Sequence, residues 1–250
     1  PLSATMIETG TIAPSSAAKV GESLIWVNQS SQGAGTVVQM DGFATKKIST
    51  YAIENVLNDN IATLSNSFGY GYQQEGHQYY VLTIPGGNIT FVYDKTGSEQ
   101  SGVPIWYQWL TYDVGTGFFS RHKGNAYAFF NDTCVLGDYQ SGNLYAIDLD
   151  TLTDNGGIRK WQRSWRALPQ PIYAPVRFSS LQLDMQTGIG VVTPSPTVEL
   201  EWADDGGHTF TTPLSRGCGA SGNTTIRVFW TRLGSTRRNS GLDRIYRVSS

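Results

Sequence analysis

Charge, cysteine and long apolar runs are all scarce in this chain of 250 residues. Charged residues make up 15% of the sequence and the formal net charge is −2, so no global attraction toward nucleic acid or acidic membranes is expected. Two cysteines, Cys134 and Cys218, are too few for a disulfide framework or a four-cysteine zinc site. No run of about 20 apolar residues occurs, so the sequence predicts no membrane span.

Catalytic signatures are also missing from the sequence. The three histidines, His77, His122 and His208, are far apart, and neither a zinc-protease helix motif nor a nucleophile elbow is present. A metal or nucleophile site would therefore have to be assembled from distant residues, and we predict no metal site and no cofactor.

Glycine and aromatic residues are abundant, with 28 Gly, 7 Trp, 13 Tyr and 10 Phe, which favours strands and tight turns over helices. Strand–turn–strand segments begin roughly 50 residues apart, a spacing typical of four-stranded propeller blades. We predict an all-β fold with a β-propeller-like body. The segments that carry this rhythm are Leu24–Met40, Tyr79–Tyr93 and Ala126–Asp138.

The chain is expected to have three parts. Residues 1–150 are predicted to form propeller-like blades, with one short helix at Ser49–Asn58. Residues 151–175, rich in proline and glycine, are interpreted as a connecting segment. Residues 176–250 are predicted to form the C-terminal blade or blades, and their strands Ile226–Leu233 and Arg244–Val248 are expected to be a final pair.

The most informative local pattern is a hairpin at residues 198–210. Val198, Leu200 and Trp202 alternate with glutamates, as in a half-buried strand, and a turn cluster follows. The pattern resembles an Asp-box, in which Asp205 would hold the turn through backbone hydrogen bonds and Phe210 would plug the hairpin into the core. Ala203 replaces the Ser or Thr usual in that motif. The hairpin residues are Asp204, Asp205, Gly206, Gly207, Thr209 and Phe210, and His208–Phe210 is expected to start the return strand.

Two patterns suggest chemistry but have simpler interpretations. Gly217–Gly222 matches the dinucleotide-binding motif G-x-G-x-x-G, yet the residues after it are strand-like and not helical, so a loop is favoured. Glu199 and Glu201 share one strand face about 6.5–7 Å apart, a separation that could serve glycoside hydrolysis. A solvated strand face is the favoured interpretation of these glutamates.

Arginines crowd the end of the sequence. A sheet edge protected by charge is the favoured interpretation; a protein interface and contact with DNA phosphates are the alternatives. The candidate interface or DNA-facing residues are Arg227, Arg232, Arg237, Arg238, Arg244 and Arg247.

An ordered series of motifs in the C-terminal third resembles the packaged-DNA stabilisation proteins, or tail hub (nozzle) subunits, of short-tailed phages. The series covers about residues 180–248 and comprises Gln182–Gly190, the 198–210 hairpin, Arg227–Gly234 and Asp243–Val248. Upstream, only the Gly137–Tyr145 element and the blade rhythm agree with that family.

The resemblance implies a non-enzymatic structural protein of the virion tail. It further implies a ring of subunits, six being the expected number, around a DNA channel. An adaptor or portal-side protein would lie above the ring, and a tail needle, fibres or spikes below it. Non-specific contact with genomic DNA in the channel is also implied.

Two rival hypotheses come from other classes of protein. The Asp-box would also suit a sialidase-like glycoside hydrolase on a propeller, in which several arginines converge on a substrate carboxylate. The aromatic-rich loops would suit a carbohydrate-binding tail module that recognises a receptor.

Overall fold

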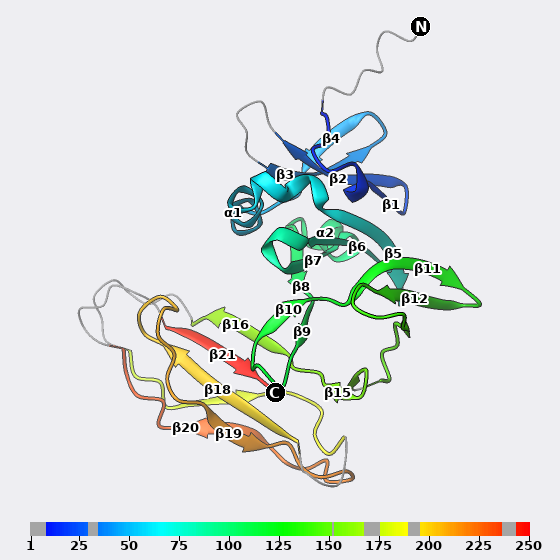
Figure 1. Ribbon diagram of the computed structural model, residues 1–250. Coiled ribbons are helices and arrows are strands. Elements are labelled where there is room, and N and C mark those ends of the chain that lie inside the picture. Colours follow the sequence, from blue (N-terminus) through cyan, green and yellow to red (C-terminus); the bar gives the residue numbers. More distant parts are fainter. Residues whose placement is uncertain (1–8, 30–34, 152, 168–175, 190–195, 237–243) are drawn as a thin grey trace, which may run out of the picture. The chain divides into compact units, whose positions relative to one another are not determined.

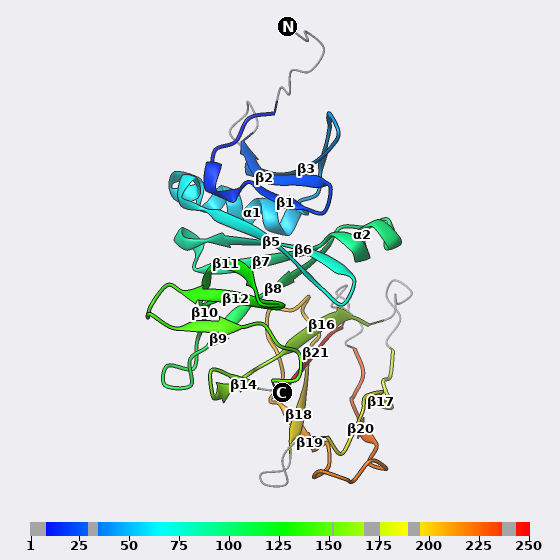
Figure 2. The same cartoon turned by 90° about the vertical axis from the view of Figure 1, so that its right-hand side faces the viewer.

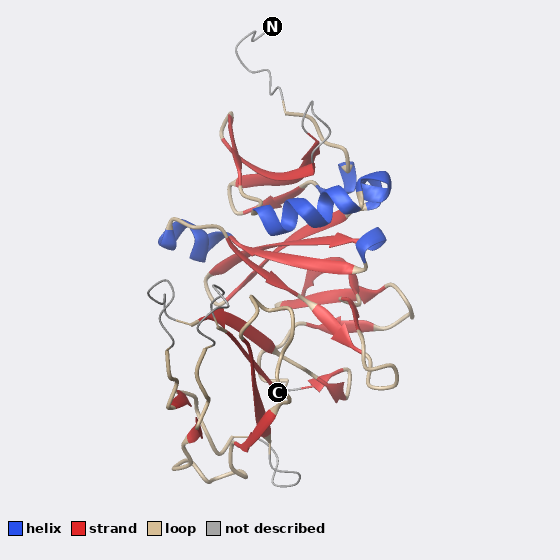
Figure 3. Ribbon diagram, turned by 90° about the vertical axis from the view of Figure 1, so that its left-hand side faces the viewer, coloured by secondary structure: helices blue, strands red, loops and turns tan. Residues whose placement is uncertain are grey.

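The computed structural model describes residues 9–29, 35–151, 153–167, 176–189, 196–236 and 244–250. The chain divides into two compact units, unit 1 from Pro1 to Arg159 and unit 2 from Lys160 to Ser250 (Figure 1). Strands dominate both units, and the described helices all belong to unit 1 (Figure 3). The predicted all-β class is therefore confirmed.

The first sheet of unit 1 is a four-stranded antiparallel meander whose strands follow chain order. Gly21 and Gly42 take positive φ angles of 60° and 63° in its first and last turns, where glycine avoids the steric cost of a side chain. The strands are β1 (Ala18–Val20), β2 (Ser23–Gln29), β3 (Gly35–Asp41) and β4 (Ala44–Lys47).

The second sheet repeats this plan with four strands in chain order. A short helix, α2 (Lys95–Ser101), interrupts the path to its last strand and was not predicted. Asp94 caps this helix by accepting a hydrogen bond of 2.8 Å from the backbone N–H of Gly97. The strands are β5 (Phe68–Gln74), β6 (His77–Ile84), β7 (Ile89–Asp94) and β8 (Ile105–Gln108).

The remainder of unit 1 contains smaller sheets. A three-stranded meander contains β11 (Gly124–Phe130), β12 (Thr133–Asp138) and β13 (Leu144–Ala146). Two strand pairs flank it, namely β9 (Leu110–Tyr112) with β10 (Phe119–Arg121), and β14 (Thr153–Asp154) with β15 (Gly157–Ile158). The third strand–turn–strand segment thus forms a sheet as predicted, although this sheet has three strands.

Helical structure in the first half of unit 1 packs into the core. The helix predicted at Ser49–Asn58 is α1 (Tyr51–Asp59), and its buried Ile53 and Leu57 join a cluster with residues of the first two sheets. Three 3-10 turns accompany it, namely η1 (Pro14–Ser16), η2 (Ile61–Asn66) and η3 (Pro85–Gly87).

Strand β5 contacts two other sheets of unit 1, through glycines on one face and tyrosines on the other. Gly69 lies close to Ser16 of η1 and Gly71 lies close to β1, where a Cβ atom at Gly71 would be 2.5 Å from the carbonyl oxygen of Lys19. Tyr70 and Tyr72 face the other way, and the Tyr70 ring stacks on Tyr127 of β11 with centroids 5.4 Å apart. Glycine therefore permits close backbone approach on one face, while tyrosine fills the space on the other. Figure 2 shows β1, β5 and β11 within unit 1.

Unit 2 contains a four-stranded sheet and a two-stranded ribbon that enclose one core. The sheet has the order β16 (Gln162–Arg166), β21 (Ile245–Ser249), β18 (Thr197–Ala203), β19 (Leu214–Gly217). The ribbon pairs β17 (Ser180–Leu183) with β20 (Val228–Thr231). Buried residues of both sheets, including Leu200, Val248 and Trp230, form a single apolar cluster.

Three expectations about residues 151–250 need correction. The two last strands are not a pair, because β20 joins β17 whereas β21 lies between β16 and β18. Strand β21 is consequently an interior strand and not a charged sheet edge. Segment 151–175, interpreted as a connection, contains β14, β15 and β16, because β16 finds its partner only at the far end of the chain.

Candidate functional site

The acidic turn after β18 is organised by one carboxylate. Asp205 Oδ1 accepts hydrogen bonds of 2.9 Å from the backbone N–H groups of both His208 and Thr209. Gly206 and Gly207 have φ angles of 76° and 96°, which glycine adopts without strain. The backbone hydrogen bond from Thr209, followed by its hydroxyl, lowers the pKa of Asp205. This aspartate is therefore a structural turn residue.

Phe210 does not plug the hairpin into the core. Residues His208–Phe210 are not a strand, and the return strand β19 begins only at Leu214. The half-buried Phe210 ring lies outside the core cluster, with the guanidinium carbon of Arg247 3.6 Å from its centroid. The ring thus covers a charged side chain, in a cation–π contact.

Arg244 is buried and forms an ion pair with the turn. Only 1% of this residue is exposed, and its Nε and Nη2 atoms donate hydrogen bonds of 2.6 and 2.8 Å to the two oxygens of Asp204. Burial opposes its charge, but the hydrogen bonds and charge of Asp204 outweigh this effect, so the pKa of Arg244 is raised. The expectation that Arg244 faces a partner or DNA is corrected, because the pair with Asp204 lets the core accept the guanidinium.

Arg247 is also paired, on the opposite face of the same sheet. Its Nε donates a hydrogen bond of 2.7 Å to Glu201, its direct cross-strand neighbour. The Glu201 carboxylate is therefore paired with the Arg247 guanidinium. Arg244 and Arg247 bind different carboxylates on opposite faces of the sheet. These two arginines therefore do not form the converging set that was considered for a sialidase-like site.

Two of the other predicted arginines, Arg227 and Arg232, flank β20. Arg227 Nη2 donates a hydrogen bond of 2.6 Å to Gln182 Oε1. Arg232, just after the strand, has a φ angle of 60° and is exposed. Arg237 and Arg238 lie outside the described residues. Among the described residues, Arg244 and Arg247 are thus ion-paired with residues of the sheet or its turn, whereas Arg227 and Arg232 lie at the ends of β20.

A depression of about 450 Å³ lies at the Arg232 end of the ribbon. Arg177 and Arg232 border it, and Ser179 and Thr231 add polar groups. No sequence pattern points to Arg177, because this residue lies 55 positions away from Arg232 and is brought near it only by strand pairing.

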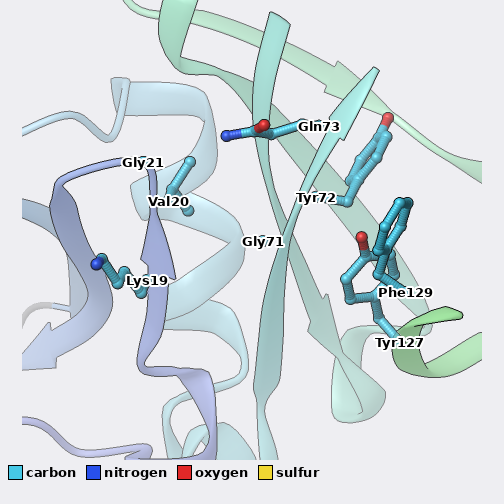
Figure 4. A pocket seen from close by; sticks show the side chains of 8 residues that line it. All are labelled: Lys19, Val20, Gly21, Gly71, Tyr72, Gln73, Tyr127 and Phe129. Carbon is cyan, nitrogen blue, oxygen red and sulfur yellow. The ribbon is translucent and has the colours of Figure 1, made fainter. Parts of the chain in front are cut away.

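A groove of about 250 Å³ lies in unit 1 between the edge strands β1, β5 and β11. Figure 4 shows Tyr72, Tyr127 and Phe129 on one side of β5, with Lys19 on the other side and pointing away from the rings. Phe129 is 62% exposed. Burial raises the pKa of Tyr127 to about 12, so its phenol remains neutral in ordinary buffers. The groove thus presents an aromatic surface on this side of β5.

Three further aspartates of unit 1 organise turns, and a turn was expected from the sequence at one of them, Asp148. Asp113, Asp138 and Asp148 each accept a hydrogen bond from the backbone N–H two residues ahead and from the hydroxyl three residues ahead. The shared signal is an aspartate followed three positions later by Ser or Thr, which is an Asx-turn pattern. These hydrogen bonds lower the pKa of all three carboxyl groups.

No cofactor or metal site emerges from the described part of the chain. No group of three or more His, Cys, Asp or Glu side chains there could hold a metal ion. Gly217–Gly222 runs from the end of β19 into a loop, with no helix between it and β20. Both cysteines are free, and burial raises the pKa of Cys218. Within the described ranges, no helix is long and apolar enough to cross a membrane.

Comparison with known proteins gives one informative match. Residues 2–152 match a family described as "Bacteriophage P22 Gp10, beta-propeller", which is more than half of the chain and most of unit 1. The C-terminal motifs lie outside this match. No curated protein matches the sequence.

Among solved structures, one similar chain is a glycoside hydrolase family 43 arabinoxylan arabinofuranohydrolase from Bacillus subtilis in complex with cellotetraose. The identity is 9% and the TM-score 0.20, with 94% of this chain and 50% of that chain covered. This chain thus spans half the length of the hydrolase, and a likeness so weak supports no conclusion about fold or activity.

Proposed function

Because the chain belongs to the family of the bacteriophage P22 structural protein Gp10, we propose that it is a tail hub subunit that closes the DNA channel below the portal and retains packaged DNA. Family membership makes it a structural component of the virion tail. The observation that carries the proposal is the match across the blade-forming region, where the structure contains successive antiparallel meanders.

The packing of unit 1 supports a mechanical role. Its first two sheets bury a continuous apolar cluster, and β5 connects to its neighbours through close backbone contact and stacked rings. Close-packed interiors transmit strain instead of yielding to it, which suits a component that resists the pressure of packaged DNA.

We further propose that the subunits form a ring, with six as the expected number. In a closed ring each subunit presents one patch to the next subunit and a different patch to the previous one. An adaptor or portal-side protein above, and a needle, fibres or spikes below, would complete the assembly.

Co-expression with the adaptor protein of the same phage tests this proposal. We expect negative-stain microscopy to show closed rings. Mass photometry should give a particle mass that is a whole-number multiple of the subunit mass, plus that of any bound adaptor. The chain alone and the adaptor alone serve as controls. A chain that stays monomeric at high concentration and forms no ring with any tail protein would contradict the proposal.

The hydrolase hypothesis gains no support, since Glu201 is paired with Arg247. The carbohydrate-binding hypothesis retains one favourable observation, the exposed Phe129 ring beside Tyr72 and Tyr127. Aromatic faces of this kind can stack on sugars. A glycan array with the unaltered chain and Phe129→Ala would decide: binding that the substitution abolishes would establish a receptor-recognition role in addition to that of a hub.

A further inference from the structure

The ribbon of β17 and β20 has one face in the core and one face in solvent. Leu183, Val228 and Trp230 pack into the apolar cluster, while Ser180, Gln182, Phe229 and Thr231 are exposed and form the outer face. We call these four residues the ribbon face; Figure 2 shows the two strands side by side. Phe229 is 49% exposed, so an aromatic ring stands in solvent among hydroxyl and amide groups.

Four arginines surround the ribbon face. Arg227 reaches Gln182, and Arg216 Nε donates a hydrogen bond of 3.2 Å to the carbonyl oxygen of Phe229. Arg177 and Arg232 border the depression at the other end. Among the described residues, none of these four guanidinium groups contacts a carboxylate, whereas Arg244 and Arg247 both do.

Two of these arginines lie at opposite ends of β20. Arg227 and Arg232 flank β20 and are about 17 Å apart at the rise of an extended strand. Asp184, one residue beyond β17, is the only acid within the ribbon or one residue of its strand ends. Positive charge therefore prevails along the whole face, even though the chain as a whole is slightly acidic.

We propose that the ribbon face and its four arginines bind the phosphate backbone of double-stranded DNA. A planar guanidinium donates paired hydrogen bonds that match phosphate oxygens. Hydroxyl and amide side chains are the other common donors to DNA phosphates. Arg227 and Arg232, at this spacing, would reach phosphates about five base pairs apart. The genome as the source of this DNA rests on the proposed function.

An acidic protein partner fits the face less well. Protein interfaces have an apolar core in which charge is depleted, whereas Phe229 is the single large apolar side chain on the ribbon face. A surface with guanidinium groups that contact no described carboxylate, and with small polar side chains, matches the polar, positively charged character of DNA interfaces.

The test measures binding of the full chain to a fluorescein-labelled 20-base-pair duplex of arbitrary sequence by anisotropy, over a series of salt concentrations. Four phosphate contacts predict a slope of about −3.6 in the plot of log K against log salt. Arg227→Gln together with Arg232→Gln should make the slope less steep by about 1.8 and weaken binding at low salt. Arg163→Gln, at an exposed arginine of β16, is the matched control and should leave the slope unchanged.

Competition separates the sources of negative charge. Unlabelled duplex should displace the probe, whereas inorganic phosphate and polyglutamate at equal charge concentration should not. Equal displacement by polyglutamate would overturn the DNA proposal in favour of an acidic protein, and displacement by phosphate alone would reduce the site to a simple anion pocket. Circular dichroism and thermal melting establish that each variant is folded.

Two results would overturn the proposal outright. One is the absence of salt-dependent duplex binding by the folded, unaltered chain, and the other is an unchanged slope in the double variant. Ring formation with the adaptor is measured separately, so its failure would contradict the tail hub alone. A chain that forms rings but does not bind the duplex would contradict the DNA face alone.

Discussion

The two units build their sheets by different means. In unit 1 the strands of each larger sheet follow one another along the chain, and β5 connects the sheets through glycine and tyrosine. In unit 2 the sheet combines β16, β18 and β21 from distant parts of the sequence, and Arg244 enters the core with its own counter-charge. The larger sheets of unit 1 thus form from strands that are neighbours in the sequence, whereas unit 2 depends on pairing between distant strands and on a buried ion pair.

The largest expected effect tests the buried ion pair of unit 2. Arg244→Met should remove about 3 kcal/mol from the free energy of unfolding of this unit, since Asp204 and the carbonyl oxygen of Leu233 lose their donor. Urea unfolding followed by hydrogen exchange would assign the loss to unit 2. Arg163→Met, at an exposed position, is the control; equal losses in the two variants would show that burial of Arg244 is not what matters.

The next effect tests the close approach of strands in unit 1. Gly71→Ala should cost about 1–3 kcal/mol, because the added methyl meets the backbone oxygen of Lys19 and the backbone must shift. Gly142→Ala, where no atom lies within 4 Å of the added Cβ, is the matched control. Thermal melting of both variants measures the difference. A melting temperature unchanged by Gly71→Ala would mean that β1 and β5 do not need this contact.

A smaller effect is expected at the second ion pair of unit 2. Glu201→Gln should cost about 1 kcal/mol or less, because the Glu201–Arg247 pair remains partly open to solvent. The same substitution at Glu199 is the control, as it leaves Arg247 paired. Chemical denaturation with added salt sharpens the test, since salt should reduce the difference between the two variants.

The smallest effect concerns the aspartate-stabilised turns, which occur in each of the two units. The pKa values of Asp113, Asp138, Asp148 and Asp205 are lowered in the folded chain. Their stabilising contribution is therefore present above the unfolded-state pKa of about 3.9 and is lost as the pH falls through the lower folded values. Melting temperatures should decline below about pH 4, and Asp138→Asn should flatten this decline slightly. An identical pH profile in the variant would contradict a role for this turn.

Much of the fold follows from local sequence. Apolar segments predicted β2 and β6, alternation of apolar and charged residues predicted β18, and the spacing of Ile53, Val56 and Leu57 predicted α1. Family membership was also predicted correctly, although the match covers residues 2–152 and not the C-terminal motifs that suggested it. The spacing of the strand–turn–strand segments was the weaker indication of the family, yet these segments lie in residues 2–152, the region that matches the family.

The candidate site was less accessible to sequence analysis. Asp204 and Arg244 are 40 positions apart, and no periodicity links a turn residue to a partner that distant. Alternation suggested that Arg244 and Arg247 were surface charges, because a pattern of charge carries no information about counter-charges on other strands. Arg177 was missed for the same reason, since only the pairing of β17 with β20 brings it to the ribbon.

The central position of β21 has a consequence for synthesis on the ribosome. Every strand of the first two sheets of unit 1 finds its neighbour within a few dozen residues, so these sheets can close while translation continues. Strand β16 must wait about 80 residues for β21, which at typical elongation rates of about 5–20 residues per second means some 4–16 s. During that interval the unpaired edge of β16 would be open to pairing with wrong strands.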